Sequence, residues 1–111
     1  MSELSIKKTV VFVCTGNTCR SPMAEYLFRR KTEDLGLYKL KVCSAGIRAK
    51  RGDTINEKSA QILIENGFDV SEFTSRKIDK RMLKDSLAIA AYEVPPAIPP
   101  NVRYLTVPFT V

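Results

Sequence analysis

The chain has 111 residues, 44% of them hydrophobic, and a net charge of +6 from 18 basic and 12 acidic side chains. This length supports one modest core, and the hydrophobic content argues against a disordered chain. The absence of histidine excludes Ser-His-Asp and Cys-His catalysis as well as histidine-containing metal sites. We expect a single domain over residues 1–111, with neither a metal nor a cofactor at its site.

Localisation and partners follow from what the sequence lacks. No apolar run is long enough to span a membrane, and the first residues lack the apolar stretch of a signal peptide. Three cysteines, an odd number, do not suit a secreted disulfide framework. We therefore expect a cytoplasmic protein without a membrane partner. The basic residues are spread along the chain without a nucleic-acid motif, so charge alone supports nucleic-acid binding and we expect none.

The first half of the chain predicts a strand, a helix and a second strand. Residues 9–13 are apolar and mostly β-branched, which is typical of a buried parallel strand. Ser21 and Pro22 suit the start of a helix, and Gly36 suits its end. Residues 38–43 alternate between polar and apolar, as a strand does, and residues 44–46 are expected to end that strand.

The second half predicts two helices followed by two strands. Residues 54–57 match a capping box for a helix that Gly67 ends. A short helix is expected over residues 79–84, and strands over residues 87–91 and 102–107, with a proline-rich loop between them. This order predicts an α/β domain of three layers, with a mostly parallel four-stranded sheet of order 2-1-3-4.

Apolar side chains predict which faces of the first two helices point inward. For the first helix these are Met23, Tyr26, Leu27 and Leu35; for the second they are Ala60, Ile62, Leu63 and Ile64.

The turn after the first strand suits an anion. A buried strand ends, a short loop with a glycine follows, and a helix begins. Ligands of open α/β sheets bind at the carboxyl ends of strands, and a helix N-terminus adds unpaired N–H groups and a partial positive charge. We therefore predict a phosphate-binding loop between Cys14 and Arg20.

Cys14 and Arg20 stand at the two ends of this loop, with five residues between them. The backbone amides of such a loop can point inward as a nest around one phosphate. Arg20 would clamp two phosphate oxygens with its planar guanidinium, and Cys14 would attack the phosphorus. The helix N-terminus and the arginine both favour the thiolate of Cys14. A buried packing cysteine and a surface arginine form the alternative interpretation.

The segment VFVCTGNTCRSPMAE resembles the phosphate loop of the low-molecular-weight protein tyrosine phosphatases. The same family is matched by residues 44–46, by residues 67–71 and by the later pair Ser75 and Arg76. The resemblance therefore covers residues 8–91. It implies a phosphocysteine intermediate on Cys14, with phosphorylated proteins as substrates.

The resemblance also implies roles for the other residues of the loop. Asn17 would hold the strained loop through hydrogen bonds, one of them with Ser44. Ser21 would hydrogen-bond the sulfur of Cys14, although a helix cap is an alternative role. Cys19 would form a reversible disulfide with the nucleophile, or serve only in packing. The implied phosphate-binding loop comprises Thr15, Gly16, Asn17, Thr18, Cys19, Arg20 and Ser21.

Thr18 bears on the choice of substrate. The amino-acid sequence of the loop is most similar to that of the family branch that acts on phosphoarginine in proteins. In that branch a threonine at this position is associated with phosphoarginine as the substrate. The threonine hydroxyl can position water or a guanidinium nitrogen, whereas its methyl group can serve packing alone. Phosphotyrosine and phosphoarginine both remain open.

The resemblance breaks at the general acid, for which the family uses an aspartate in a late Asp-Pro-aromatic motif. Residues 107–109 read Val-Pro-Phe, and Val107 cannot donate a proton. The late acidic residues are Asp79, Asp85 and Glu93, of which Glu93 is the nearest substitute, so the general acid stays unassigned. The family's C-terminal helix also has no counterpart, which would expose apolar surface; we expect a monomer or a weak dimer.

Three functions follow in order of preference. The first is a protein phosphatase, and the second is a family member that binds phosphate or a phosphoprotein with little turnover, which the missing aspartate favours. The third is arsenate reduction, for which a related branch uses the same loop and a further cysteine pair downstream. No cysteine follows Cys43, so arsenate reduction ranks below the other two.

Overall fold

The computed structural model describes residues 9–84 and 86–91, together with the backbone of residues 103–106. Its elements, in chain order, are β1 (Thr9–Cys14), α1 (Arg20–Asp34), β2 (Lys41–Gly46), α2 (Glu57–Glu65), α3 (Lys80–Lys84), β3 (Ala88–Ala91) and β4 (Arg103–Thr106). The predicted order of helices and strands is therefore confirmed, with bounds that differ by a few residues.

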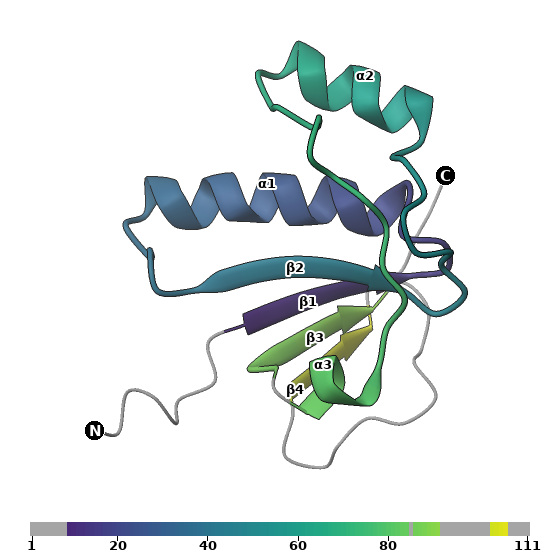
Figure 1. The fold of residues 1–111 in the computed structure, drawn as a ribbon. Helices are drawn as coiled ribbons and strands as arrows, with labels where there is room; N and C mark the ends of the chain where they lie inside the picture. The colour runs from purple at the N-terminus through teal and green to yellow at the C-terminus, as the bar shows by residue number, and fades with distance from the viewer. Residues whose placement is uncertain (1–8, 85, 92–102, 107–111) are drawn as a thin grey trace.

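The strands form one sheet of order β2-β1-β3-β4, and every pairing between them is parallel (Figure 1). The predicted strand order is correct. Because β1 lies in the interior of the sheet, its last residue, Cys14, pairs with Gly46 at the end of β2. The carboxyl ends of both strands thus meet at the edge where a ligand is expected.

Helices cover both faces of the sheet and give three layers (Figure 1). On one face α1 runs along β1 and β2, with Phe28 against Phe12 edge to face at 5.5 Å between ring centroids, and α2 packs on α1. The opposite face carries the hydrophobic core, to which α3 contributes Leu83. The core comprises Val11, Val13, Ala45, Ile78, Leu83, Ile89 and Ala91.

The inward face of α1 was predicted correctly only in part, because Met23 and Tyr26 are half-buried but the two leucines are not. Leu27 and Leu35 are 53% and 62% exposed, whereas Glu25 and Thr32 are buried. Apolar residues mark the buried face of a helix only where the opposing surface is apolar, and part of α1 packs against a hydrogen-bonded network instead.

The inward face of α2 was predicted correctly only at Leu63, which is buried. Its neighbours Ile62 and Ile64 are 48% and 59% exposed. Successive residues of a helix point about 100° apart, so three residues around Leu63 cannot all face the same neighbour.

The second strand lies three residues later than predicted, because residues 44–46 belong to it instead of ending it. At its last residue, the N–H of Gly46 donates to the carbonyl of Arg76 at 2.9 Å, and its carbonyl accepts from the N–H of Ile78 at 2.9 Å. This pairing with the segment before α3 extends the strand, whereas Tyr38 is exposed.

The helix cap of α2 also differs from the prediction. Asn56, not Thr54, is the N-cap, and its Oδ1 accepts from the N–H groups of Lys58 and Ser59 at 3.0 and 3.3 Å. The backbone N–H of Asn56 donates to the carbonyl of Thr18 at 2.6 Å. The start of α2 is thereby tied to the predicted phosphate loop.

Several predictions concern residues outside the described part of the chain: the proline-rich loop, Asp85, Glu93 and residues 107–109. No helix that the structure describes is long and apolar enough to cross a membrane.

The cap assignment predicts a difference between two alanine variants. Asn56→Ala should lower the free energy of unfolding by about 1 kcal/mol, because two N–H groups of α2 lose their acceptor. Thr54→Ala should leave it nearly unchanged. Urea unfolding followed by circular dichroism measures both, and an equal loss in the two variants would contradict Asn56 as the cap.

Candidate active site

The predicted phosphate loop occupies the turn between β1 and α1, over residues 15–19. Cys14, at the end of β1, is 2% exposed. The loop is held against the segment after β2, because the carbonyls of Cys14 and Thr15 accept from the N–H groups of Ile47 and Arg48 at 2.9 and 2.8 Å. The first part of the loop is therefore fixed to the sheet edge.

Asn17 is the only described non-glycine residue with a positive φ, at 55°, and it is completely buried. Its Nδ2 donates to the hydroxyls of Ser21 and Ser44, both at 2.9 Å, so the expected contact with Ser44 is present. Its Oδ1 accepts from the N–H of Arg76 at 2.8 Å. Asparagine tolerates this backbone region better than most residues, and these three contacts hold it there.

Four backbone amides of the loop point to no other described residue. Those of Gly16, Asn17, Thr18 and Cys19 have no acceptor in the part of the chain that the structure describes. Cys19 is the N-cap of α1, and no side chain caps this helix. These four amides, beside the positive end of a 15-residue helix, would suit one anion.

Ser21 lies inside α1, so the alternative that it caps this helix is wrong. Its Oγ is 2.9 Å from the Sγ of Cys14 and 3.4 Å from the carbonyl of Ala45. Because Asn17 donates to this oxygen, the hydroxyl proton of Ser21 is free for the sulfur at 2.9 Å or for the more distant carbonyl of Ala45. A hydroxyl that donates to sulfur stabilises the thiolate over the thiol.

Arg20 and Thr15 meet across the mouth of the loop. Nη2 of Arg20 donates to Oγ1 of Thr15 at 3.3 Å, and both residues are half-buried. The guanidinium therefore lies beside the residue that follows Cys14.

Thr18 and Cys19 face different neighbours. The hydroxyl of Thr18 lies over Gly16, 3.6 Å from where a Cβ would stand on that glycine. Cys19 is exposed, and its Sγ accepts a hydrogen bond from Ser59 of α2 at 3.2 Å. A disulfide between Cys14 and Cys19 stays a prediction.

Gly46 has no room for a side chain. A Cβ there would lie 2.6 Å from the carbonyl oxygen of Thr15, 2.7 Å from the backbone nitrogen of Asn17 and 2.9 Å from Cβ of Ala49. The close approach of β2 to the loop thus gives a physical reason for the glycine at the end of residues 44–46.

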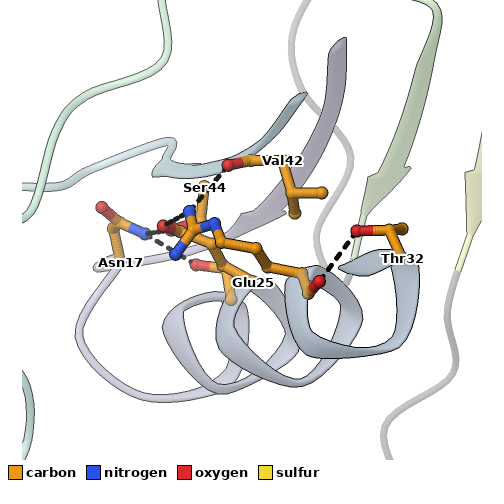
Figure 2. A network of polar contacts seen from close by, with 7 residues as sticks. Asn17, Glu25, Thr32, Val42 and Ser44 are labelled. Carbon is orange, nitrogen blue, oxygen red and sulfur yellow. Dashed lines mark hydrogen bonds and ion pairs between the residues drawn. The ribbon is translucent and has the colours of Figure 1, made fainter. Parts of the chain in front are cut away.

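Sequence reasoning missed two residues behind the loop, Glu25 and Arg29. Oε1 of Glu25 accepts from the hydroxyl of Ser44 at 2.5 Å, and Oε2 forms an ion pair with Arg29 (Figure 2). The signal was present as Glu and Arg four residues apart on a helix, but such pairs are usually solvent-exposed.

Cys43 lies apart from this network and packs against the hydrophobic core on the other face of the sheet. Burial raises the pKa of its thiol, although the nearby Arg76 opposes this shift. Cys43 is therefore a weaker nucleophile at neutral pH than an ordinary exposed cysteine.

Known proteins were compared with this fold and site. The sequence profile of the family described as low molecular weight phosphotyrosine protein phosphatase matches residues 9–93. The chain belongs to this family. Among curated relatives, an arsenate reductase 2 of Staphylococcus saprophyticus is 42% identical over 102 residues, which cover 87% of this chain and 72% of that protein.

Two solved structures of phosphatase-family relatives share the fold. YfkJ from Bacillus subtilis matches with a TM-score of 0.74 at 37% identity, over 79% of this chain and 57% of that one. The YwlE arginine phosphatase from Geobacillus stearothermophilus matches with a TM-score of 0.67 at 33% identity, over 76% and 51%. The chain thus spans little more than half the length of these two relatives.

Gly46→Ala should disturb the loop without unfolding the sheet. The added Cβ would meet backbone atoms of Thr15 and Asn17 below 3.0 Å, a strain on the order of 1–3 kcal/mol. Vanadate affinity should fall about tenfold or more.

Gly36→Ala is the matched control, because Gly36 has a φ of 76° at the far end of α1 with open space around it. It should cost about 1–2 kcal/mol of stability and leave vanadate affinity unchanged. Isothermal titration would decide, and equal affinity in the two variants would contradict the role of Gly46.

Proposed function

We propose that the protein is a cysteine-dependent phosphatase that acts on phosphorylated proteins through a phosphocysteine on Cys14. The observation that carries this proposal is the hydroxyl of Ser21 at 2.9 Å from the Cys14 sulfur, beneath a loop in which the amides of residues 16–19 donate to no other described residue. A donor aimed at a buried sulfur favours a thiolate, and the amides suit the phosphoryl group that this thiolate would attack.

The reaction has two steps. The Cys14 thiolate attacks phosphorus, the S–P bond forms, and the bond from phosphorus to the substrate's oxygen or nitrogen breaks with its electron pair on the leaving group. Water then attacks the phosphocysteine, which releases inorganic phosphate and restores the thiolate. In both steps the loop amides and Arg20 stabilise the charge on the equatorial oxygens.

Phosphotyrosine and phosphoarginine are the two substrate classes proposed. Thr18 and the likeness to an arginine phosphatase support phosphoarginine. Likeness to the tyrosine phosphatase AmsI of Erwinia amylovora, at 28% identity with a TM-score of 0.67, supports phosphotyrosine. A cytoplasmic location and a monomeric or weakly dimeric state stay predictions.

A member of the family with weak turnover is the alternative, because no described residue is assigned as the general acid. Glu25 is the one buried carboxylate among the described residues, and it is bound to Ser44 and Arg29 behind the loop. It is therefore not placed to protonate a leaving group at the mouth.

Arsenate reduction is a second candidate function, favoured by the relatives named arsenate reductase at about 40% identity. Arsenate has the shape and charge of phosphate, so the same loop suits it. Reduction also needs two electrons from thiols, and Cys14 and Cys19 are the two cysteines of the loop. Arsenite formation with a thiol reductant, alongside phosphate release, separates the two functions.

Phosphate release from p-nitrophenyl phosphate tests the phosphatase directly. Cys14→Ser should abolish release, and Arg20→Lys should lower kcat/KM by about 100-fold, because the bidentate donor is lost while the charge is kept. Cys43→Ser is the matched control and should retain full activity. Release that survives in Cys14→Ser would refute the proposed nucleophile.

Leaving-group basicity tests for a general acid. Without one, the rate of phosphocysteine formation should fall steeply as the leaving phenol becomes more basic, because negative charge develops on an unprotonated oxygen. Phosphotyrosine should then react far more slowly than the nitrophenyl ester, whereas phosphoarginine, with its labile P–N bond, should remain usable. Single-turnover rates across a series of aryl phosphates measure this, and a flat series would show that an acid is present.

A further inference from the structure

A buried chain of hydrogen bonds leads from the nucleophile to an ion pair behind the loop. It runs through Cys14, Ser21, Asn17, Ser44, Glu25 and Arg29. Figure 2 shows Asn17, Ser44 and Glu25 gathered between α1 and β2. These hydrogen bonds thus connect the first three turns of α1 to the end of β2.

The orientation of the Asn17 side-chain amide is fixed by Arg76, which is not part of this chain of hydrogen bonds. The N–H of Arg76 can only donate, so the atom of Asn17 that faces it at 2.8 Å is Oδ1. The amide nitrogen must then donate one proton to Ser21 and the other to Ser44. Both serine oxygens are acceptors as a result, and each hydroxyl proton must point elsewhere.

The two serine protons have different destinations. The proton of Ser44 goes to Oε1 of Glu25 at 2.5 Å, a charge-assisted hydrogen bond. The proton of Ser21 has two acceptors within reach, the sulfur of Cys14 at 2.9 Å and the carbonyl of Ala45 at 3.4 Å, and it points to the shorter contact when Cys14 is a thiolate. Hydrogen bonds in such a network strengthen one another, so a charged acceptor at Ser44 stiffens the contacts that hold Asn17 and Ser21 in place.

Glu25 is 8% exposed, and a buried carboxylate is stable as an anion only when it is paired. Arg29 supplies that pairing, and its Nη2 also donates to the carbonyl of Val42 at 2.8 Å. Arg76, from the segment before α3, lines the same cavity as this pair. A cation of its own helix therefore pairs with Glu25, and a second cation lines the same cavity.

We propose that Glu25, paired with Arg29, is a positioning residue that sustains the Cys14 thiolate through Ser44, Asn17 and Ser21. This inference rests on the proposed function, in which Cys14 is the nucleophile. Glu25 touches neither the substrate nor the sulfur, and its effect passes through the hydrogen-bond chain.

The direction in which loss of Glu25 shifts the balance between the Cys14 thiol and thiolate distinguishes this role from a direct charge–charge interaction. Through space, the negative charge of Glu25 opposes a second negative charge on Cys14, so its removal would favour the thiolate. Through the hydrogen-bond chain, its removal loosens the donor at Ser21 and disfavours the thiolate. The two accounts predict opposite shifts.

The pH dependence of Cys14 alkylation by neutral iodoacetamide measures this shift without requiring turnover. The full chain with Cys19→Ser and Cys43→Ser leaves one thiol to follow. Glu25→Gln keeps the shape, but its single oxygen cannot serve both Ser44 and Arg29. The midpoint of the profile should move to higher pH, and the rate on its acid side should fall about three- to tenfold.

Two further variants define the route. Glu33→Gln, an exposed glutamate of the same helix that lines the same cavity, should leave the profile unchanged. Ser44→Ala should reproduce the shift, and adding Glu25→Gln to it should add little, because the chain is already broken. Ser44→Ala also keeps the test decisive if Glu25→Gln fails to fold.

An unchanged midpoint, or one that moves to lower pH, in Glu25→Gln or in Ser44→Ala would overturn the inference, as would full additivity in the double variant. If the wild-type protein releases no phosphate but the two variants still show these shifts, the proposed function is contradicted and the role of Glu25 stands.

Discussion

The buried side chain of Asn17 is the constraint on which the site depends. Its three hydrogen bonds join the loop to Ser21 of α1, to Ser44 of β2 and to the backbone of Arg76. Those contacts hold a positive φ that turns the loop, and in the turned loop the amides of residues 16–19 donate to no other residue that the structure describes. An anion is the natural occupant of such a turn.

The sheet supplies the frame in which that constraint works. Parallel pairing of β1 and β2 brings Cys14 level with Gly46, so the proposed nucleophile and the support of the loop meet at one edge. The absence of a side chain at Gly46 lets the loop lie directly against β2. The positions of Cys14, the loop and the supporting strand are therefore consequences of one parallel arrangement.

Much of this architecture was predictable from the sequence, because buried parallel strands appear as short apolar runs and the loop joins such a run to a helix start. The polar face of α1 was not predictable in the same way. Glu25 contacts Ser44, which is distant in the sequence, and an apolar pattern carries no information about such partners. The cap of α2 was misplaced for a related reason, since Thr54 and Asn56 are both good caps in isolation.

The central claim is that the phosphoryl group passes through the sulfur of Cys14. Rapid acid quench of the wild-type chain with an aryl phosphate, followed by fragment mass spectrometry, tests it most directly. The account predicts one phosphoryl group on Cys14, formed within the first turnover and lost as phosphate is released. A phosphoryl group on another residue, or product without any phosphorylated protein, would contradict it.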